Sequence, residues 1–181
     1  MSDLSRPLPV VLMFGIMYRD KTLADKTISL LQQRYGELLD DGVVYDFSTH
    51  SPYYDSEMGS GISKKLIAMK TLIPRDKIVE IKQYAVDLEQ QFSRDGKREV
   101  NIDPGLISEE NFILSTGKNF THRIYLRDGV FAEVTLIFVK GNKFRTLPWT
   151  YLDYTKEPAA DWLLKTRSWL LQQRIKGEKN A

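Results

Sequence analysis

The sequence predicts an α+β fold with a mostly antiparallel sheet, and three observations support this prediction. Strand and helix patterns follow one another in the order β-α-β-β-α-β over residues 8–103, which is the order of a ferredoxin-like unit. The pair Asp128-Gly129 separates two apolar runs and is typical of a two-residue hairpin turn. An amphipathic helix pattern closes the chain. We therefore expect a ferredoxin-like βαββαβ unit that is extended by a β-meander and a C-terminal helix.

The alternative is an α/β doubly wound fold. It fits less well, because the predicted meander must be antiparallel and the second link between strands contains no helix. No Pro/Gly/Ser-rich linker, internal repeat or low-complexity tract divides the 181 residues. We expect a single α+β domain over residues 1–181.

Apolar patterns in the first part of the chain outline two strands and a helix. Residues 8–18 are apolar on both faces, as expected of a central strand. Asp20 can cap the helix that follows, in which apolar residues recur at helical spacing up to Gly36. A second strand is expected over residues 43–49, and residues 50–61 are expected to form a loop.

The middle of the chain contains one ambiguous segment. Residues 62–73 have apolar spacing that fits a helix, but their short length and the loop before them suit a strand, and we favour the strand. Pro74 opens a clearer helix that ends near Phe92. A short strand over residues 97–102 should end at the Pro-Gly pair of positions 104–105, which suits a type II turn.

The last part of the chain should begin with a short helix. Ser108 can cap it and Gly117 can end it. The remaining expected elements are the two hairpin strands, the third strand of the meander and the final helix, at residues 122–127, 130–139, 143–147 and 158–175.

The composition argues against several classes of protein. Twenty-six basic and 24 acidic residues leave a net charge of +2, which is too small to drive bulk binding to nucleic acid or to an anionic membrane. No apolar run reaches the roughly 20 residues that a membrane-spanning helix needs, and no cleavable export signal is evident, so we expect a cytoplasmic protein. The absence of cysteine excludes disulfides, thiolate catalysis and thiolate metal sites.

The motifs of common enzyme classes are also missing from the sequence. The phosphate-binding loop, the dinucleotide-binding glycine pattern and the nucleophile elbow of hydrolases do not occur. His50 and His122 are far apart and fit no zinc motif. A magnesium site built from carboxylates alone has no sequence signature and stays open. We therefore assign no metal ligand and no cofactor, and whether the protein is an enzyme stays open.

Glu133 is the unusual residue of the predicted hairpin. A regular hairpin with a two-residue turn places Tyr125 opposite Ala132. It makes His122 and Glu133 diagonal cross-strand neighbours within side-chain reach. Glu133 interrupts an otherwise apolar run, so its carboxylate needs either a partner or a functional role. A structural contact with histidine or arginine and a functional carboxylate beside His122 both fit the pattern.

Six polar residues on and near the hairpin form the candidate site. Cations beside carboxylates can bind a phosphate or carboxylate ligand and carry out acid–base chemistry. The candidate catalytic residues are His122, Glu133 and Asp103, and the candidate ligand-binding residues are Lys118, Arg123 and Tyr125. The same basic side chains could instead be solvated edge residues that deter aggregation.

Two aromatic segments, residues 53–54 and 147–154, could form the walls of a pocket, or they could pack over the core. Several segments of the chain also resemble an uncharacterised family of bacterial proteins that is catalogued as a domain of unknown function. These segments are residues 53–59, 101–105, 121–126, 131–136 and 148–154. Some members of that family carry a GTP-binding label. The resemblance covers nearly the whole chain and implies a bacterial cytoplasmic protein, but it implies no activity and no catalytic residues.

Two classes of function remain. The first is binding of a small anionic ligand, phosphorylated or nucleotide-like, with or without catalysis. The alternative is a non-enzymatic protein-interaction module in which the aromatic segments and the last helix form the partner surface and Glu133 is structural. Nucleic-acid binding is a weaker hypothesis, because only residues 118–145 have a clear basic excess, with six basic and two acidic residues.

Overall fold

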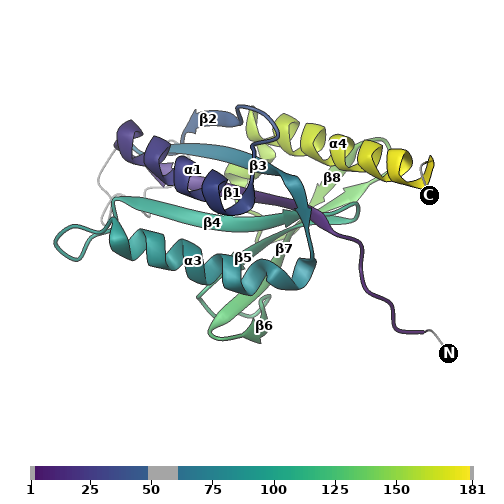
Figure 1. Ribbon diagram of the computed structural model, residues 1–181, viewed down its shortest axis with the longest axis horizontal. Coiled ribbons are helices and arrows are strands. Elements are labelled where there is room, and N and C mark those ends of the chain that lie inside the picture. Colours follow the sequence, from purple (N-terminus) through teal and green to yellow (C-terminus); the bar gives the residue numbers. More distant parts are fainter. Residues whose placement is uncertain (1–2, 49–60, 180–181) are drawn as a thin grey trace.

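The computed structural model describes residues 3–48 and 61–179 of the chain (Figure 1). His50 and the aromatic residues at positions 53–54 lie outside these ranges. None of the described helices is long and apolar enough to cross a membrane. The helices and strands are β1 (Val10–Tyr18), α1 (Lys21–Tyr35), β2 (Val43–Asp46), β3 (Ser63–Ile73), α3 (Ile78–Gln91), β4 (Val100–Ile107), β5 (Asn111–Thr116), β6 (Ile124–Arg127), β7 (Val130–Val139), β8 (Lys143–Thr146) and α4 (Ala159–Lys179).

The first four strands and two helices form the expected ferredoxin-like unit. Their order in the sheet is β2-β3-β1-β4, and every neighbouring pair is antiparallel. The ambiguous segment at 62–73 is a strand, β3. Asp20 caps α1 as expected, because its Oδ1 accepts a hydrogen bond of 2.8 Å from the Thr22 amide. The prediction of a mixed α+β architecture is thus confirmed.

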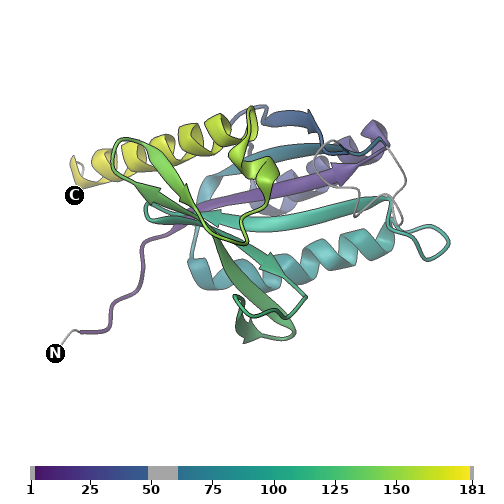
Figure 2. The ribbon, with the colours of Figure 1, turned by 180° about the vertical axis from the view of Figure 1, so that it is seen from behind.

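Strand β1 separates two apolar layers, and all nine of its residues are buried. Its even-numbered residues, such as Leu12 and Phe14, pack against α1 and α3. Its odd-numbered residues, such as Val11 and Met13, face α4, which contributes Trp162 and Leu163. Figures 1 and 2 show α1 and α3 on one face of this part of the sheet and α4 on the other. This two-sided cover explains why the sequence of β1 is apolar without alternation.

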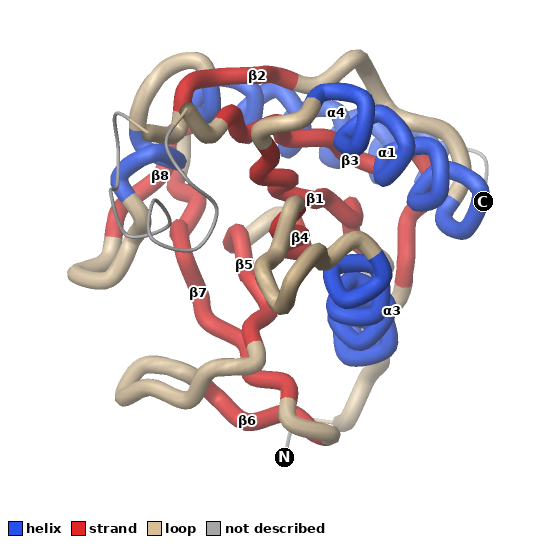
Figure 3. The backbone as a smooth tube through the Cα atoms, turned by 90° about the vertical axis from the view of Figure 1, so that its left-hand side faces the viewer, coloured by secondary structure: helices blue, strands red, loops and turns tan. Residues whose placement is uncertain are grey.

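The second half of the chain extends the same sheet. The order continues from β4 through β5 and β7 to β6, and β8 also pairs with β7. Both expected hairpins, β6–β7 and β7–β8, are present, but β5 occupies one edge of β7, so β6 and β8 both pair with its other edge and the three strands do not form the predicted meander. The turn residues Asp128 and Gly129 have positive φ angles of 52° and 77°. Figure 3 shows how the sheet curves from β2 through β1 towards β7 and β6.

Around β4 and β5 the sequence prediction is wrong in two respects. The strand predicted over residues 97–102 is present, but it spans Val100–Ile107 and runs through Pro104 and Gly105 without the predicted turn. Pro104 is tolerated because β4 pairs with β5 only from Gly105 onwards, so no second neighbour needs its missing N–H. Gly105 is required because a Cβ there would lie 2.8 Å from the Ile113 carbonyl oxygen.

The helix predicted over residues 108–117 is instead a tight turn followed by β5. Ser108 does accept hydrogen bonds from following amides, those of Glu110 and Asn111, but these close a turn between two strands. Phe112 and Leu114 are both buried, which is the two-residue period of a strand. A run of six residues with this alternation is too short for a stable helix.

Strands β4 and β5 separate at one end, and this separation matters for the site. Their pairing covers only residues 105–107 of β4. The other half of β4, with Asn101 and Asp103, pairs with β1 alone. The sheet therefore has a local gap between the beginning of β4 and the end of β5, where polar side chains from both strands can meet.

Candidate functional site

A cavity of about 770 Å³ lies at the gap between β4 and β5. Its outer wall is the segment 147–155, which we call the strap and which connects β8 to α4. A volume of this size is typical of pockets for metabolites and cofactors. The charged side chains that line it are Lys64, Lys82, Glu89, Arg98, Asp103, Lys118, Arg123, Glu133 and Asp153.

The carboxylate of Glu133 forms the centre of the first polar cluster. Glu133 is 2% exposed, and its Oε2 accepts a hydrogen bond of 2.7 Å from Arg123 Nε. His122 Nε2 lies 3.1 Å from the same oxygen. The other oxygen, Oε1, is buried and has no hydrogen-bond partner within the described part of the chain. An unpaired carboxylate oxygen inside a protein is costly, so this atom is the clearest unsatisfied group of the cavity.

The hairpin register that produces this cluster differs from the predicted one. Tyr125 pairs with Phe131 and not with Ala132, because Leu126 is an extra residue in β6. Extending the observed register by one residue brings Arg123 opposite Glu133, so both Arg123 and His122 reach the carboxylate. The prediction that His122 and Glu133 are neighbours is confirmed. The bulge at Leu126, which brings Arg123 to the same carboxylate, has no sequence signature.

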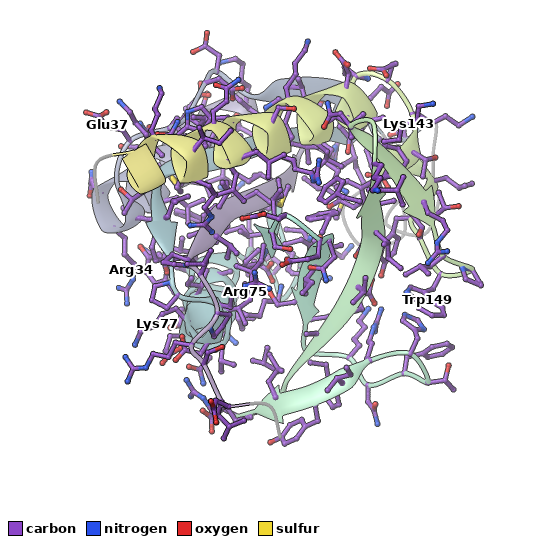
Figure 4. All side chains as sticks on the ribbon, turned by 90° about the vertical axis from the view of Figure 1, so that its right-hand side faces the viewer. Arg34, Glu37, Arg75, Lys77, Lys143 and Trp149 are labelled. Atoms are coloured by element: carbon purple, nitrogen blue, oxygen red, sulfur yellow. The ribbon has the colours of Figure 1, made fainter. Side chains whose placement is uncertain are left out.

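The strap fixes the orientation of the His122 ring. Its ring stacks on Trp149 at a centroid distance of 4.7 Å and an interplanar angle of 9°. Trp149 is fixed in turn, since its Nε1 donates a hydrogen bond to the Val134 carbonyl oxygen. In Figure 4, Trp149 lies on the same side of the molecule as Lys143 of β8. The imidazole does not line the cavity, so His122 acts on the cavity through Glu133.

Arg123 joins Glu133 to the strap and to the segment before β6. Its Nη1 donates to the Lys118 carbonyl oxygen at 2.9 Å, and its Nη2 donates to the Tyr151 hydroxyl at 3.1 Å. Partial burial by itself lowers the pKa of Arg123, but the bond to Glu133 and its charge raise that pKa above the ordinary value. Burial and the charge of Glu133 likewise raise the pKa of Tyr151. The guanidinium therefore stays charged and the phenol stays neutral at physiological pH.

A second polar cluster lies around Asp103 on β4. Asp103 Oδ2 accepts a hydrogen bond of 2.8 Å from Asn101 Nδ2, and its Oδ1 lies 3.6 Å from Lys82 Nζ. Arg98 donates to Asn101 Oδ1 and lies 3.4 Å from buried Glu89. Burial raises the pKa of Glu89, although the charge of Lys82 and the Ile102 amide oppose the shift.

A third cluster ties the strap to β3. Lys64 Nζ and Asp153 Oδ2 form an ion pair of 2.6 Å, and their side chains are 4% and 3% exposed. The Tyr45 hydroxyl donates to the same oxygen at 2.8 Å. Burial alone lowers the pKa of Lys64, but the charge of Asp153 raises it above the ordinary value. Gly15 of β1 leaves the necessary room, since a Cβ there would lie 3.2 Å from Lys64 Cε.

The structure brings most of the predicted site residues together. Asp103, Lys118, Arg123 and Glu133 line the same cavity, and His122 contacts Glu133. Tyr125 does not join them, because it is 58% exposed on β6 and packs against Phe131.

Sequence reasoning missed five charged residues of the lining: Lys64, Lys82, Glu89, Arg98 and Asp153. Two of them carried a usable signal. Lys82 and Glu89 follow Ile78 and Ala85 by four residues, so they occupy the apolar face of α3, where a charged side chain is unexpected. Asp153 had a weaker signal, as a lone carboxylate in an aromatic segment.

The carboxylates of the cavity do not form a metal site of the usual kind. Within residues 3–48 and 61–179, no group of three or more His, Cys, Asp or Glu side chains could hold a metal ion. Each acidic residue of the lining has instead a basic side chain within 4.0 Å: Glu133 with Arg123, Asp153 with Lys64, Asp103 with Lys82 and Glu89 with Arg98.

Comparison with protein families identifies the domain. Residues 8–169 match the family model described as Domain of unknown function (DUF4416). The chain belongs to this family. The match includes every residue that lines the cavity, so the cavity is part of the family domain. No curated protein and no solved structure shows significant similarity to the chain. The family description carries no activity; bacterial origin stays a prediction, and the GTP-binding label of some members is not confirmed for this chain.

Proposed function

We propose that this protein binds a small anionic ligand, phosphorylated or nucleotide-like, in the cavity beneath the strap. The observation that carries the proposal is a metabolite-sized cavity whose lining, within residues 3–48 and 61–179, includes five basic and four acidic side chains. Each of the four acids lies within 4.0 Å of a base, so their charge is largely compensated inside the lining. Among the described residues of the lining, five basic side chains thus face four acidic ones, and this balance favours an anion.

Lys118 and Arg123 are the residues that we assign to the anionic group. Both line the cavity, and they lie next to each other because Arg123 donates to the Lys118 carbonyl oxygen. Guanidinium and ammonium groups that line the same cavity are usual partners of phosphate. Acid–base catalysis by Glu133, Asp103 and His122 stays a prediction, since the geometry supports binding more directly than turnover.

The cavity also favours this proposal over the protein-interaction module. A module that binds partners through its surface needs no polar cavity at Glu133, whereas a ligand in the cavity accounts for the Oε1 of this lining residue, which the described residues leave unsatisfied. Buried charged groups are expensive to maintain and concentrate at functional sites.

A thermal-shift screen tests the proposal. Inorganic phosphate, sugar phosphates and nucleotides are added with and without magnesium, and the melting temperature is recorded. A ligand at 100 times its dissociation constant stabilises the folded protein by about 2.7 kcal/mol, which corresponds to roughly 5–10 °C for a domain of this size. We expect at least one phosphorylated compound to give such a shift.

A pair of matched charge reversals locates the binding. Lys118→Glu places a negative charge at the cavity and should weaken the ligand about tenfold or more. Lys143→Glu makes the same change at an exposed residue of β8 outside the cavity lining and should leave the affinity unchanged. Equal effects of the two variants, or no shift with any anionic compound, would contradict the proposal.

A further inference from the structure

Glu133 has a hydrogen-bonding capacity that the described residues do not use. Both of its contacts, with Arg123 and with His122, involve Oε2. Oε1 is buried and has no partner among residues 3–48 and 61–179. Because Glu133 lines the cavity, a molecule inside the cavity is the natural source of a hydrogen bond to this oxygen.

The carboxylate cannot easily turn to share its partners between the two oxygens. Arg123 is fixed by its bonds to the Lys118 carbonyl oxygen and the Tyr151 hydroxyl. His122 is fixed by its stacking on Trp149. The two groups that hold Oε2 are therefore anchored, and Oε1 keeps its orientation in the absence of a ligand.

The charges around Glu133 indicate what kind of donor it accepts. Arg123 already compensates the carboxylate at 2.7 Å. An ammonium group at Oε1 would add a second cation close to this guanidinium, which is unfavourable in a buried place. A neutral hydroxyl supplies the missing hydrogen bond without adding charge.

We infer that the ligand is a phosphate ester of a polyhydroxylated compound, with one hydroxyl donating to Glu133 Oε1 and the phosphate near Lys118 and Arg123. This inference rests on the proposed function and assigns the chemical class of its ligand. The anion and the hydroxyl are recognised at neighbouring places, because Arg123 contacts both Glu133 and the backbone of Lys118.

Replacement of Glu133 by glutamine gives a sharp test. In Glu133→Gln the amide oxygen must face Arg123 Nε, because that nitrogen can only donate. The amide NH₂ then takes the place of Oε1, so an acceptor becomes a donor. A ligand hydroxyl that donates to Oε1 loses this charge-assisted bond and can only turn to accept a weaker, neutral bond from the NH₂, whereas the basic groups that bind the phosphate stay in place.

The experiment is titration calorimetry with three probes: inorganic phosphate, glucose 6-phosphate and ribose 5-phosphate. For the unmodified protein we expect at least one sugar phosphate to bind tenfold or more tightly than inorganic phosphate. Glu133→Gln should weaken that sugar phosphate about tenfold but should not weaken inorganic phosphate, because the replacement removes a negative charge beside Arg123. Glu37→Gln is the matched control, since Glu37 is an exposed residue that Figure 4 shows on the opposite side from Trp149.

Each outcome separates the two proposals. If sugar phosphates bind no better than inorganic phosphate, the inference about hydroxyl recognition is wrong and the anion site stands. If Glu133→Gln affects no probe, Oε1 is not a ligand contact and the inference is again wrong. If no phosphorylated probe binds at all, the proposed function itself fails. The comparison of probes on the unmodified protein decides the question even if Glu133→Gln does not fold.

Discussion

Glu133 and Arg123 form a buried ion pair at the centre of the first polar cluster of the cavity. They are 2% and 11% exposed at the side chain and lie 2.7 Å apart. Removing one partner of such a pair leaves an uncompensated buried charge, which costs more than the pair contributes in net stability. The pair is therefore best tested by comparing single and double replacements.

Replacement of Arg123 by leucine should destabilise the protein strongly. The carboxylate of Glu133 would keep only His122 as a partner, and we expect a loss of about 3–5 kcal/mol in the free energy of unfolding. The double variant Arg123→Leu with Glu133→Gln should recover a large part of this loss, because neither charge of the pair is then left buried without its partner. Urea denaturation of the three proteins measures both values, and equal stabilities of the single and double variants would show that the charge is not the cause.

Glu89 should make stability depend on pH. Burial raises its pKa above the ordinary value of 4.5 in the folded protein. The folded state then holds a proton that the unfolded state has lost, so the contribution of Glu89 is fully present below pH 4.5 and is lost as pH rises through the raised pKa. The stability of the unmodified protein relative to Glu89→Gln should therefore fall as pH rises from 4 to 8. A difference between the two that is flat over this range, measured by urea denaturation, would contradict the raised pKa.

The site could be predicted only in part from single residues. Glu133 stands out because it is a charge within an apolar run, and His122 follows from the hairpin. Arg123 joins them because of a bulge at Leu126, and no residue type in this part of the sequence predicts that bulge. Lys64 and Asp153 are 89 positions apart in sequence, so their ion pair depends on how the strap folds back on the sheet.

At the scale of elements, strand β4 determines where the cavity forms. The sequence predicts an end to this strand at Pro104 and Gly105, because proline and glycine are typical of turns. In the fold the same two residues allow β4 to continue while β5 departs from it. Pro104 needs no second strand neighbour, and Gly105 allows the Ile113 backbone to approach closely.

Substitution of Gly105 tests this role. A Cβ at position 105 would lie 2.8 Å from both the Ile113 carbonyl oxygen and the Phe112 ring, so Gly105→Ala should push β5 away from β4. We expect a destabilisation of about 1–3 kcal/mol, which is typical of overpacking. Gly117→Ala is a matched control, because a Cβ there meets nothing within 4 Å. Equal melting temperatures for the two variants would contradict the close approach of β4 and β5.

The elements that the sequence predicts correctly have strong local signals. β1 is uniformly apolar, α1 has a capping residue, and the hairpin has an Asp-Gly turn. The helix predicted over residues 108–117 is wrong, because the local sequence does not distinguish the start of a helix from a turn. The Ser108 hydroxyl can accept hydrogen bonds from the following amides in a turn as well as at a helix start. The segment is a strand because Phe112 and Leu114 both pack into the core, and these core partners are distant in sequence.

At the scale of the whole molecule, the ion pair of Lys64 and Asp153 holds the strap on the sheet. The strap closes the cavity and positions Trp149 and Tyr151, which in turn hold His122 and Arg123. The cavity is thus a product of a ferredoxin-like unit, the strands β5 to β8 that extend its sheet and the connection to α4.

Replacement of Asp153 should loosen the strap before it unfolds the domain. Asp153→Asn removes the charge that compensates buried Lys64, and the strap can lift to let water reach the ammonium group. We expect faster amide hydrogen exchange over residues 149–155 and unchanged exchange in β1. Asp161→Asn, which changes an exposed carboxylate on α4, is the control. Unchanged exchange in the strap would show that this ion pair does not hold it.

The central claim, that the cavity beneath the strap binds a phosphorylated anion, is tested most directly by an NMR titration of the isotope-labelled protein. Glucose 6-phosphate is added stepwise, and amide and indole resonances are followed. We predict saturable shifts that are confined to Ser115–Lys118, the strap with the Trp149 indole, and the neighbourhood of Arg123 and Glu133. Shifts concentrated on other surfaces, or no saturable shift with glucose 6-phosphate or a nucleotide, would contradict the claim.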